Sequence, residues 1–465
     1  GKDSMSGSFM DLNVPPTLIT FAVETADVKD IISPEFKNEG NRVYLFKCER
    51  DEFEMPDFEC LKDGYKLINE QIRRGKIISA SSVGEGGIAY SLFRMCSGNK
   101  KGFRFEKNIE PGQLFSPDYG SIVFEVKGDL DPVNCKLLGE VTKTGFIESG
   151  EERLDIEELI NISGETLEKI FPAKLLSTRE DPETILYKKR GRATAISKFG
   201  KPRIVIPVFP GTNCEYDTAR AFERAGGVAE TIVFNNLNAG NIRASIKRLT
   251  EAITNSQIIS IPGGFSAGDE PDGSGKFIAA VFRNPHVSEA VSGLVEKRGG
   301  LMLGICNGFQ ALIKLGLLPY GEIRDLNEDS PTLTFNSLGR HVSTMVNTKV
   351  TSLLSPWFLL SEAGDIHTIP VSHGEGRFSA DDNLIKQLEI NGQIATQYTD
   401  PEGNPTYDIK FNPNGSDHSI EGITSPDGRI FGKMGHSERV TAGTFKNIPG
   451  NKFQRIFESG IKYFK

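Results

Sequence analysis

The feature that most constrains the fold is a short segment in which the apolar run 300–305 passes through Gly304-Ile305-Cys306-Asn307-Gly308 into a helical pattern. A strand that turns directly into a helix, with a cysteine at the corner, is typical of a nucleophile elbow. Such a turn needs glycines because the nucleophile has a strained backbone and its neighbours leave no room for a Cβ atom. Helix N–H groups beside Cys306 would favour its thiolate. The alternative is a small buried cysteine at a strand end.

Apolar runs alternate with amphipathic helical patterns over residues 201–465. The runs lie at 204–209, 231–234, 258–261 and 301–303. This alternation predicts an α/β domain with a doubly wound, mostly parallel sheet, in which functional residues lie at the carboxyl ends of the strands. Cys306 occupies such a position.

Changes of pattern divide the 465 residues, which are too many for one core, into three segments. Residues 1–150 mix strands and helices in an order that predicts an α+β domain. Residues 151–200 are rich in charge and predict a helical linker. Residues 201–465 form the predicted α/β domain.

Composition excludes several classes of function. A net charge of -8 does not favour nucleic-acid binding. No apolar run approaches the ~20 residues that span a bilayer, and the N-terminus has no signal-peptide pattern, so no membrane partner is expected. Six cysteines spread over this length predict neither a disulfide framework nor a metal site, and they favour a reducing, cytoplasmic compartment.

A cysteine nucleophile needs a base, and the base needs an orienting group. The candidates are His436 and Glu438, two residues apart after the apolar stretch 429–434. If that stretch is a strand that continues through them, both side chains lie on one face and Glu438 fixes the tautomer of the imidazole. By itself the pattern also fits a surface histidine beside a carboxylate.

A glycine-rich turn, Gly263-Gly264-Phe265-Ser266, follows the apolar run 258–261. Backbone N–H groups around Gly264 and Phe265, together with the N–H of Asn307, would stabilise an oxyanion. A phosphate-binding loop is the competing interpretation, but this turn matches neither common phosphate-loop pattern.

Taken together, G-I-C-N-G-F-Q, P-G-G-F-S-A-G-D and G-H-S-E-R resemble the class I glutamine amidotransferase domain. The resemblance implies that Cys306 attacks the side-chain amide of glutamine. It also implies that His436 protonates the departing ammonia and then activates water, while Glu438 holds His436. Gln310, one helical turn beyond the cysteine, would touch the bound glutamine.

Two further segments, H-G-E-G-R-F at 373–378 and N-P-N-G-S at 412–416, resemble the phosphoribosylformylglycinamidine synthase family. In that family they line the glutaminase pocket and the contact with the synthetase, which implies a glutamine-site role for His373 and Glu375. The family's common M-P-H-P-E-R is M-G-H-S-E-R here, without either proline. The opening G-K-D-S-M and the segment 82–89 resemble the synthetase portion of the large single-chain form. Residues 1–150 would then be a C-terminal subdomain related to aminoimidazole ribonucleotide synthetase.

The resemblance implies the glutaminase part of a ligase in purine biosynthesis. Ammonia from glutamine would pass to a synthetase that uses ATP to convert formylglycinamide ribonucleotide to formylglycinamidine ribonucleotide. The chain would be a C-terminal portion that lacks the main ATP site, with the missing synthetase domains and glutamine as its partners. No cofactor or metal is expected in the glutaminase domain, and ATP and Mg²⁺ are expected for the full enzyme. The alternatives are another triad-type cysteine hydrolase and an interaction module that is dormant without its synthetase.

Overall fold

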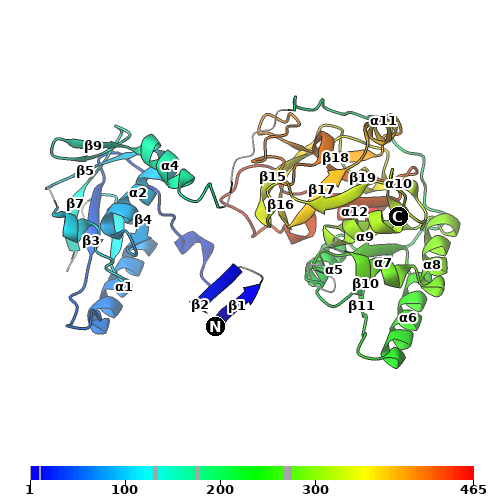
Figure 1. The fold of residues 1–465 in the computed structure, drawn as a ribbon, viewed down its shortest axis with the longest axis horizontal. Helices are drawn as coiled ribbons and strands as arrows, with labels where there is room; N and C mark the ends of the chain where they lie inside the picture. The colour runs from blue at the N-terminus through cyan, green and yellow to red at the C-terminus, as the bar shows by residue number, and fades with distance from the viewer. Residues whose placement is uncertain are drawn as a thin grey trace. The chain divides into compact units, whose positions relative to one another are not determined.

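The computed structural model describes residues 2–9, 12–107, 109–128, 135–170, 172, 179–265 and 275–465. The chain forms two compact units, Gly1–Phe171 and Pro172–Lys465, both drawn in Figure 1. The boundary between them falls inside the segment 151–200. The helix of that segment, α4 (Ile156–Glu165), belongs to the first unit.

The first unit contains a seven-stranded sheet in the order β4-β6-β3-β7-β5-β8-β9. Its strands are β3 (Arg42–Phe46), β4 (Ile77–Ser82), β5 (Gly102–Phe105), β6 (Ile122–Val126), β7 (Cys135–Thr142), β8 (Phe146–Ser149) and β9 (Glu152–Asp155), and its helices, besides α4, are α1 (Phe58–Arg73), α2 (Gly87–Asn99) and the short α3 (Pro111–Leu114). An antiparallel pair, β1 (Lys2–Phe9) and β2 (Leu12–Thr20), precedes this sheet in the chain.

The central strand β3 is buried on both faces of the sheet, as its burial pattern shows. Val43 and Leu45 belong to one apolar cluster together with Leu92 of α2. Tyr44 and Phe46 belong to another cluster together with Ile68 of α1. Because successive side chains of a strand point to opposite faces, α1 and α2 cover opposite sides of the sheet.

The first unit contains a disulfide between Cys48 and Cys60. The cysteine spacing predicts no disulfide framework, and this single disulfide does not make one, since Cys96, Cys135, Cys214 and Cys306 are free thiols. The chain doubles back between them through a bridge of Arg50 with Pro56, and this brings two cysteines 12 residues apart to a Cα separation of 6.0 Å. A reducing compartment was inferred from cysteine usage, and this disulfide weakens that inference.

The second unit is built on a nine-stranded sheet in the order β11-β10-β12-β13-β20-β19-β18-β15-β16. Its strands are β10 (Arg203–Val208), β11 (Val228–Val233), β12 (Ile258–Ile261), β13 (Leu301–Ile305), β15 (Val342–Val350), β16 (Ile366–His373), β18 (Ile394–Thr399), β19 (Ile420–Thr424) and β20 (Ile430–Lys433). A separate antiparallel pair consists of β14 (Thr332–Phe335) and β17 (Glu375–Ser379).

The helices of the second unit follow the strands as the alternation predicts. They are α5 (Glu215–Arg224), α6 (Ala239–Thr254), α7 (Lys276–Phe282), α8 (Pro285–Ser292), α9 (Asn307–Leu315), α10 (Leu317–Tyr320), α11 (Asp382–Ile390) and α12 (Ile456–Tyr463). Among the residues that the structure describes, no helix has the length and apolar character needed to cross a bilayer.

Only part of the sheet is parallel. Neighbouring strands from β11 to β20 run parallel, and those from β20 to β16 run antiparallel. The prediction of a mostly parallel sheet therefore holds for the first five strands of the order and is wrong for the rest. Three of the antiparallel pairs, β15 with β16, β18 with β19 and β19 with β20, consist of strands that follow one another with no α-helix between them, whereas parallel neighbours need a crossover connection. Since β12, β13 and β20 are adjacent and parallel, their carboxyl ends meet at one edge of the sheet.

Candidate active site

Cys306 lies at the corner between β13 and α9, as a nucleophile elbow requires. Its backbone has φ 53° and ψ -107°, a strained conformation for a residue with a side chain. The glycines on either side are needed because of close packing. A Cβ atom on Gly308 would lie 2.0 Å from the carbonyl oxygen of Ile261, and one on Gly304 would lie 2.7 Å from the carbonyl of Gly308. The Cys306 side chain is buried, with 5% exposed, at the start of the helix.

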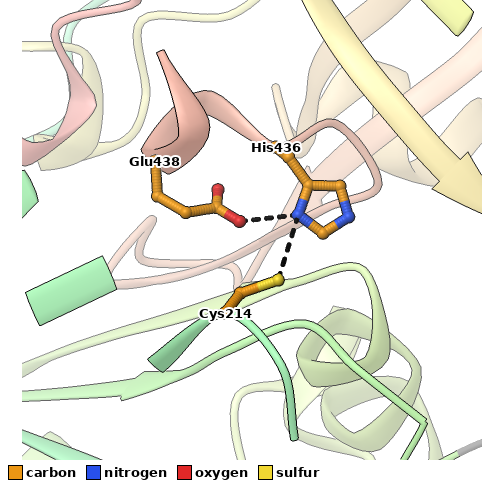
Figure 2. Close-up of side chains that lie close together, drawn as sticks. All are labelled: Cys214, His436 and Glu438. Carbon is orange, nitrogen blue, oxygen red and sulfur yellow. Dashed lines mark hydrogen bonds and ion pairs between the residues drawn. The ribbon is translucent and has the colours of Figure 1, made fainter. Parts of the chain in front are cut away.

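His436 and Glu438 lie in a turn just beyond β20, which is the strand next to β13. Figure 2 shows the Glu438 carboxylate pointing at the imidazole, and His436 Nδ1 is 2.6 Å from Glu438 Oε1. The expectation that a continuing strand brings the two together is wrong. The strand ends at Lys433, and residues Ser437–Arg439 form a 3-10 turn. Side chains two residues apart come into contact in a tight turn, just as they do on one face of a strand.

The surroundings of His436 favour its protonated form. Burial lowers the pKa of the imidazole, but the Glu438 carboxylate and the thiols of Cys214 and Cys306 outweigh this and raise it well above its ordinary value. Burial likewise raises the pKa of Glu438, and the imidazole next to it brings that pKa below its usual value. With Nδ1 donating to Glu438, Nε2 is the nitrogen at which His436 gains and loses a proton. Nε2 is buried and has no well-formed hydrogen bond among the described residues.

The base also depends on a glycine from a third strand end. Gly263 follows β12, and a Cβ atom there would lie 2.6 Å from Cε1 of the His436 ring. The ring therefore packs directly on the backbone that leaves β12. Residues from the ends of β12, β13 and β20 thus meet at one place, as expected for parallel neighbours.

Cys214, which the sequence did not mark as a site residue, lies near the same ring nitrogen of His436 as Glu438 does. Its Sγ is 3.8 Å from His436 Nδ1, and Arg439 Nη2 donates to the same sulfur at 2.9 Å. Figure 2 shows the sulfur and the Glu438 carboxylate both directed at Nδ1. Its place in the sequence could have indicated a site residue, because Cys214 follows the carboxyl end of β10, in the same parallel part of the sheet.

Cys214, His436 and Glu438 are also the group of described residues that could hold a metal ion, with ligand atoms within 4.8 Å of one another. Two observations favour a hydrogen-bond network instead. A metal would have to break the 2.6 Å contact between the imidazole and the carboxylate. It would also lie beside the Arg439 guanidinium, whose charge repels a cation.

The predicted oxyanion turn is described only as far as Phe265, so Ser266 to Asp269 lie outside the described residues. The N–H of Phe265 donates to the carbonyl of Gly211 at 2.7 Å and is therefore already engaged. Gly264 has φ 149° and lies so close to that segment that a Cβ atom would be 2.5 Å from Gly211 O. In this structure the Phe265 N–H is therefore hydrogen-bonded within the protein and does not point to a substrate oxyanion.

The candidate substrate contacts form one buried hydrogen-bonded chain beside the elbow. Asn307 Nδ2 donates to Gln310 Oε1 at 3.0 Å, and Gln310 Nε2 donates to the carbonyl of Glu375 at 2.7 Å. The Cys306 thiol faces the carbonyl of Ser372 at 3.7 Å. The elbow and the 372–375 segment are therefore in direct contact.

His373 is buried and stays neutral. Burial, with smaller contributions from His436 and His341, lowers its pKa to about 3. Its Nδ1 is 3.0 Å from Asn336 Oδ1, and the Asn336 side chain also donates to the His373 carbonyl at 2.8 Å. Asn414, from the N-P-N-G-S segment, donates to the carbonyl of Gly376 at 2.7 Å. That segment therefore supports β17, which begins at Glu375, two residues after β16 ends at His373.

The second unit of the chain is similar in sequence to known proteins. Residues 201–464 match the family model described as CobB/CobQ-like glutamine amidotransferase domain. The phosphoribosylformylglycinamidine synthase subunit PurQ of Methanococcus maripaludis strain S2 is 35% identical over 239 residues, which cover 51% of this chain and 82% of that protein. PurQ of Symbiobacterium thermophilum is 36% identical over 261 residues, which cover 56% of this chain and 96% of that protein. A chain of the PurLQS structure from Thermotoga maritima aligns with 57% of this chain and 100% of its own length, at 27% identity and a TM-score of 0.41.

Proposed function

The chain belongs to the CobB/CobQ-like family of glutamine amidotransferases, and we propose that its second unit hydrolyses glutamine with Cys306 as nucleophile, His436 as acid and base, and Glu438 as the group that orients His436. One observation carries the assignment of these roles. The elbow cysteine and the His436–Glu438 pair come from the ends of adjacent parallel strands and meet at one buried place.

The chemistry follows from the protonation states that the site favours. Cys306 loses its proton to His436 Nε2, and the thiolate attacks the side-chain amide carbon of glutamine. The tetrahedral intermediate collapses as His436 returns the proton to the nitrogen, which leaves as ammonia. His436 then removes a proton from water, which attacks the thioester and releases glutamate with the thiol restored. Glu438 stabilises the imidazolium that forms in each half of the reaction.

The proposed substrate contacts divide into two groups. The N–H of Asn307 would donate to the oxyanion, because Asn307 directly follows the nucleophile and begins α9. Gly264 and Phe265 would contribute only if the turn moves, since the Phe265 N–H is donated to Gly211. Gln310, Glu375 and the neutral His373 would hold the glutamine side of the pocket. Gln310 donates to the carbonyl of Glu375, and the Asn336 side chain holds His373 in place.

The wider reaction proposed for the chain is that of phosphoribosylformylglycinamidine synthase, a ligase of purine biosynthesis. The support is the similarity to proteins named PurQ subunits of that enzyme. Ammonia would pass to a synthetase that uses ATP and Mg²⁺, and the glutaminase unit itself would need no cofactor. In this proposal the first unit is a subdomain related to aminoimidazole ribonucleotide synthetase, the main ATP site lies outside this chain, and the enzyme is cytoplasmic.

Glutamine turnover tests the proposal. The chain alone, and the chain mixed with the remaining synthetase domains, would be assayed for glutamate and ammonia beside a Cys306→Ala variant. We expect turnover that rises when the synthetase domains are added, and a loss of at least about 10³-fold in the variant. Wild-type rates in the variant, or peptide cleavage without glutamine turnover, would contradict the proposal. The second of these results would favour a cysteine hydrolase of another kind.

A further inference from the structure

Two fully buried charged side chains lie beneath the turn that carries His436 and Glu438. Lys433 ends β20 and Glu421 lies in β19, and their charged groups are 3.4 Å apart with 0% of either side chain exposed. The antiparallel pairing of Gly422 with Lys433 brings them together. Burial of two charges costs more free energy than an apolar pair of similar size would. Stability of the core alone therefore does not explain the pair.

The polar contacts of the pair lead to the two residues that flank His436. Lys433 Nζ donates to the carbonyl of Gly435 at 3.0 Å and to Ser437 Oγ at 3.0 Å. Glu421 Oε1 accepts from the N–H of Gly435 at 2.7 Å. The two charged groups therefore fix the residue before His436 and the residue after it.

Further hydrogen bonds hold both the ion pair and the turn. Thr396 Oγ1 donates to the second oxygen of Glu421, and Ser437 Oγ donates to Gln454 Oε1 at 2.7 Å. The backbone N–H of His436 donates to the carbonyl of Pro370 at 2.8 Å. The turn is thus connected to the sheet at each of its three residues from Gly435 to Ser437.

The turn has little rigidity of its own. Gly435 leaves its backbone the widest conformational freedom, and a serine side chain such as that of Ser437 offers the backbone alternative local hydrogen bonds. A displacement of about 1 Å at a catalytic group costs about 10²-fold in rate. A base in such a turn needs support from elsewhere in the fold.

We propose that the Lys433–Glu421 ion pair positions His436 for catalysis by holding the Gly435–Ser437 turn in one conformation. The inference rests on the proposed glutaminase function. Lys433 and Glu421 act through the turn and not on the reacting atoms, so they are positioning residues. Burial lowers the pKa of Lys433, and the carboxylates of Glu421 and Glu438 oppose this by favouring its charged form.

The test replaces both charges while keeping the volume, with the double variant Glu421→Gln/Lys433→Met. We expect kcat for glutamine hydrolysis to fall about 10- to 100-fold and KM to stay within about twofold, because the predicted substrate contacts lie on other elements. The alkaline limb of the rate profile should move to lower pH as the His436–Glu438 contact loosens. Rates are expressed per molecule that a glutamine-analogue electrophile labels, so that unfolded protein does not count.

A matched control removes an ion pair that lies just before β20. Arg429 Nε is 2.6 Å from Asp427 Oδ2 at the start of β20, away from the turn. The variant Asp427→Asn/Arg429→Gln should lose stability and keep kcat. Equal effects of the two double variants on kcat would overturn the inference, since both would then report general destabilisation.

A milder variant keeps the test decisive if the double variant does not fold. Ser437→Ala removes one acceptor of Lys433 and should lower kcat about 2- to 10-fold with KM unchanged. Wild-type kcat and pH profile in Ser437→Ala and in any folded Glu421→Gln/Lys433→Met protein would overturn the inference. Absence of glutamine turnover by the wild-type chain, even with the synthetase domains added, would instead remove the proposed function.

Discussion

Two turns at the ends of adjacent parallel strands build the candidate site, and they are held in place by different means. The elbow after β13 is fixed by backbone packed against backbone, with Gly308 lying on the carbonyl of Ile261. The turn after β20 is fixed by buried side chains, Lys433 and Glu421, which reach it from the sheet below. The first turn tolerates no added atom, whereas the second depends on particular hydrogen bonds.

The largest expected effect comes from adding one carbon to the elbow. In Gly308→Ala the new Cβ would lie 2.0 Å from Ile261 O, a backbone atom that has no room to move. We expect the free energy of unfolding to fall by about 3 kcal/mol or more, with loss of activity. Denaturant unfolding followed by circular dichroism measures it.

The matched control adds the same carbon to the other turn. In Gly435→Ala the new Cβ would meet the Cδ1 atom of Ile369 at 2.2 Å, the far end of a flexible side chain that has other rotamers. The expected loss of stability is about 1 kcal/mol. Equal losses in the two variants would contradict the claim that only the elbow is held by rigid backbone contact.

The next effect concerns the charge that supports the base. Glu438→Gln keeps the shape of the side chain and removes the carboxylate that raises the pKa of His436. With a lower pKa the imidazolium is lost at lower pH, so the alkaline limb of kcat/KM should move toward acid. The rate itself should fall about 10²-fold.

A comparison variant for this prediction is Glu458→Gln, the same change at an exposed position of α12. It should leave both the rate and the pH profile unchanged. An unshifted alkaline limb in Glu438→Gln would show that Glu438 does not set the pKa of His436.

The smallest effect is expected at Cys214. Its sulfur is 3.8 Å from His436 Nδ1, farther than the Glu438 oxygen at 2.6 Å. Cys214→Ala should therefore lower kcat only about 2- to 5-fold, and Cys135→Ala, a cysteine of the first unit, should have no effect. A loss in Cys214→Ala as large as that in Cys306→Ala would make Cys214 the candidate nucleophile.

The sequence predicted those parts of the site that depend on local pattern. The glycines around Cys306 indicated the elbow, because close backbone packing requires glycine at these positions. The alternation of strands and helices indicated that the elbow lies at a strand end. His436 and Glu438 were predicted as neighbours, although the geometry was wrong, since a turn and a strand both bring residues two apart together.

The contacts that the sequence did not predict join residues that no local sequence pattern links. Cys214 reaches His436 across 222 residues of chain, and Glu421 meets Lys433 across two strands of the sheet. A single charged residue in an apolar run does not indicate which residue it pairs with. The Cys48–Cys60 disulfide was missed for the same reason, because only the returning loop between them brings the two thiols together.

The most direct test of the central claim is to identify which thiol a glutamine-analogue electrophile labels. The folded chain would be treated with diazo-oxonorleucine and the modified peptide identified by mass spectrometry. Because Cys306 lies at the helix start beside the base and Cys214 is held by Arg439, the account predicts one adduct, on Cys306, and no adduct in folded Cys306→Ala protein. An adduct on Cys214 with Cys306 unmodified would contradict it.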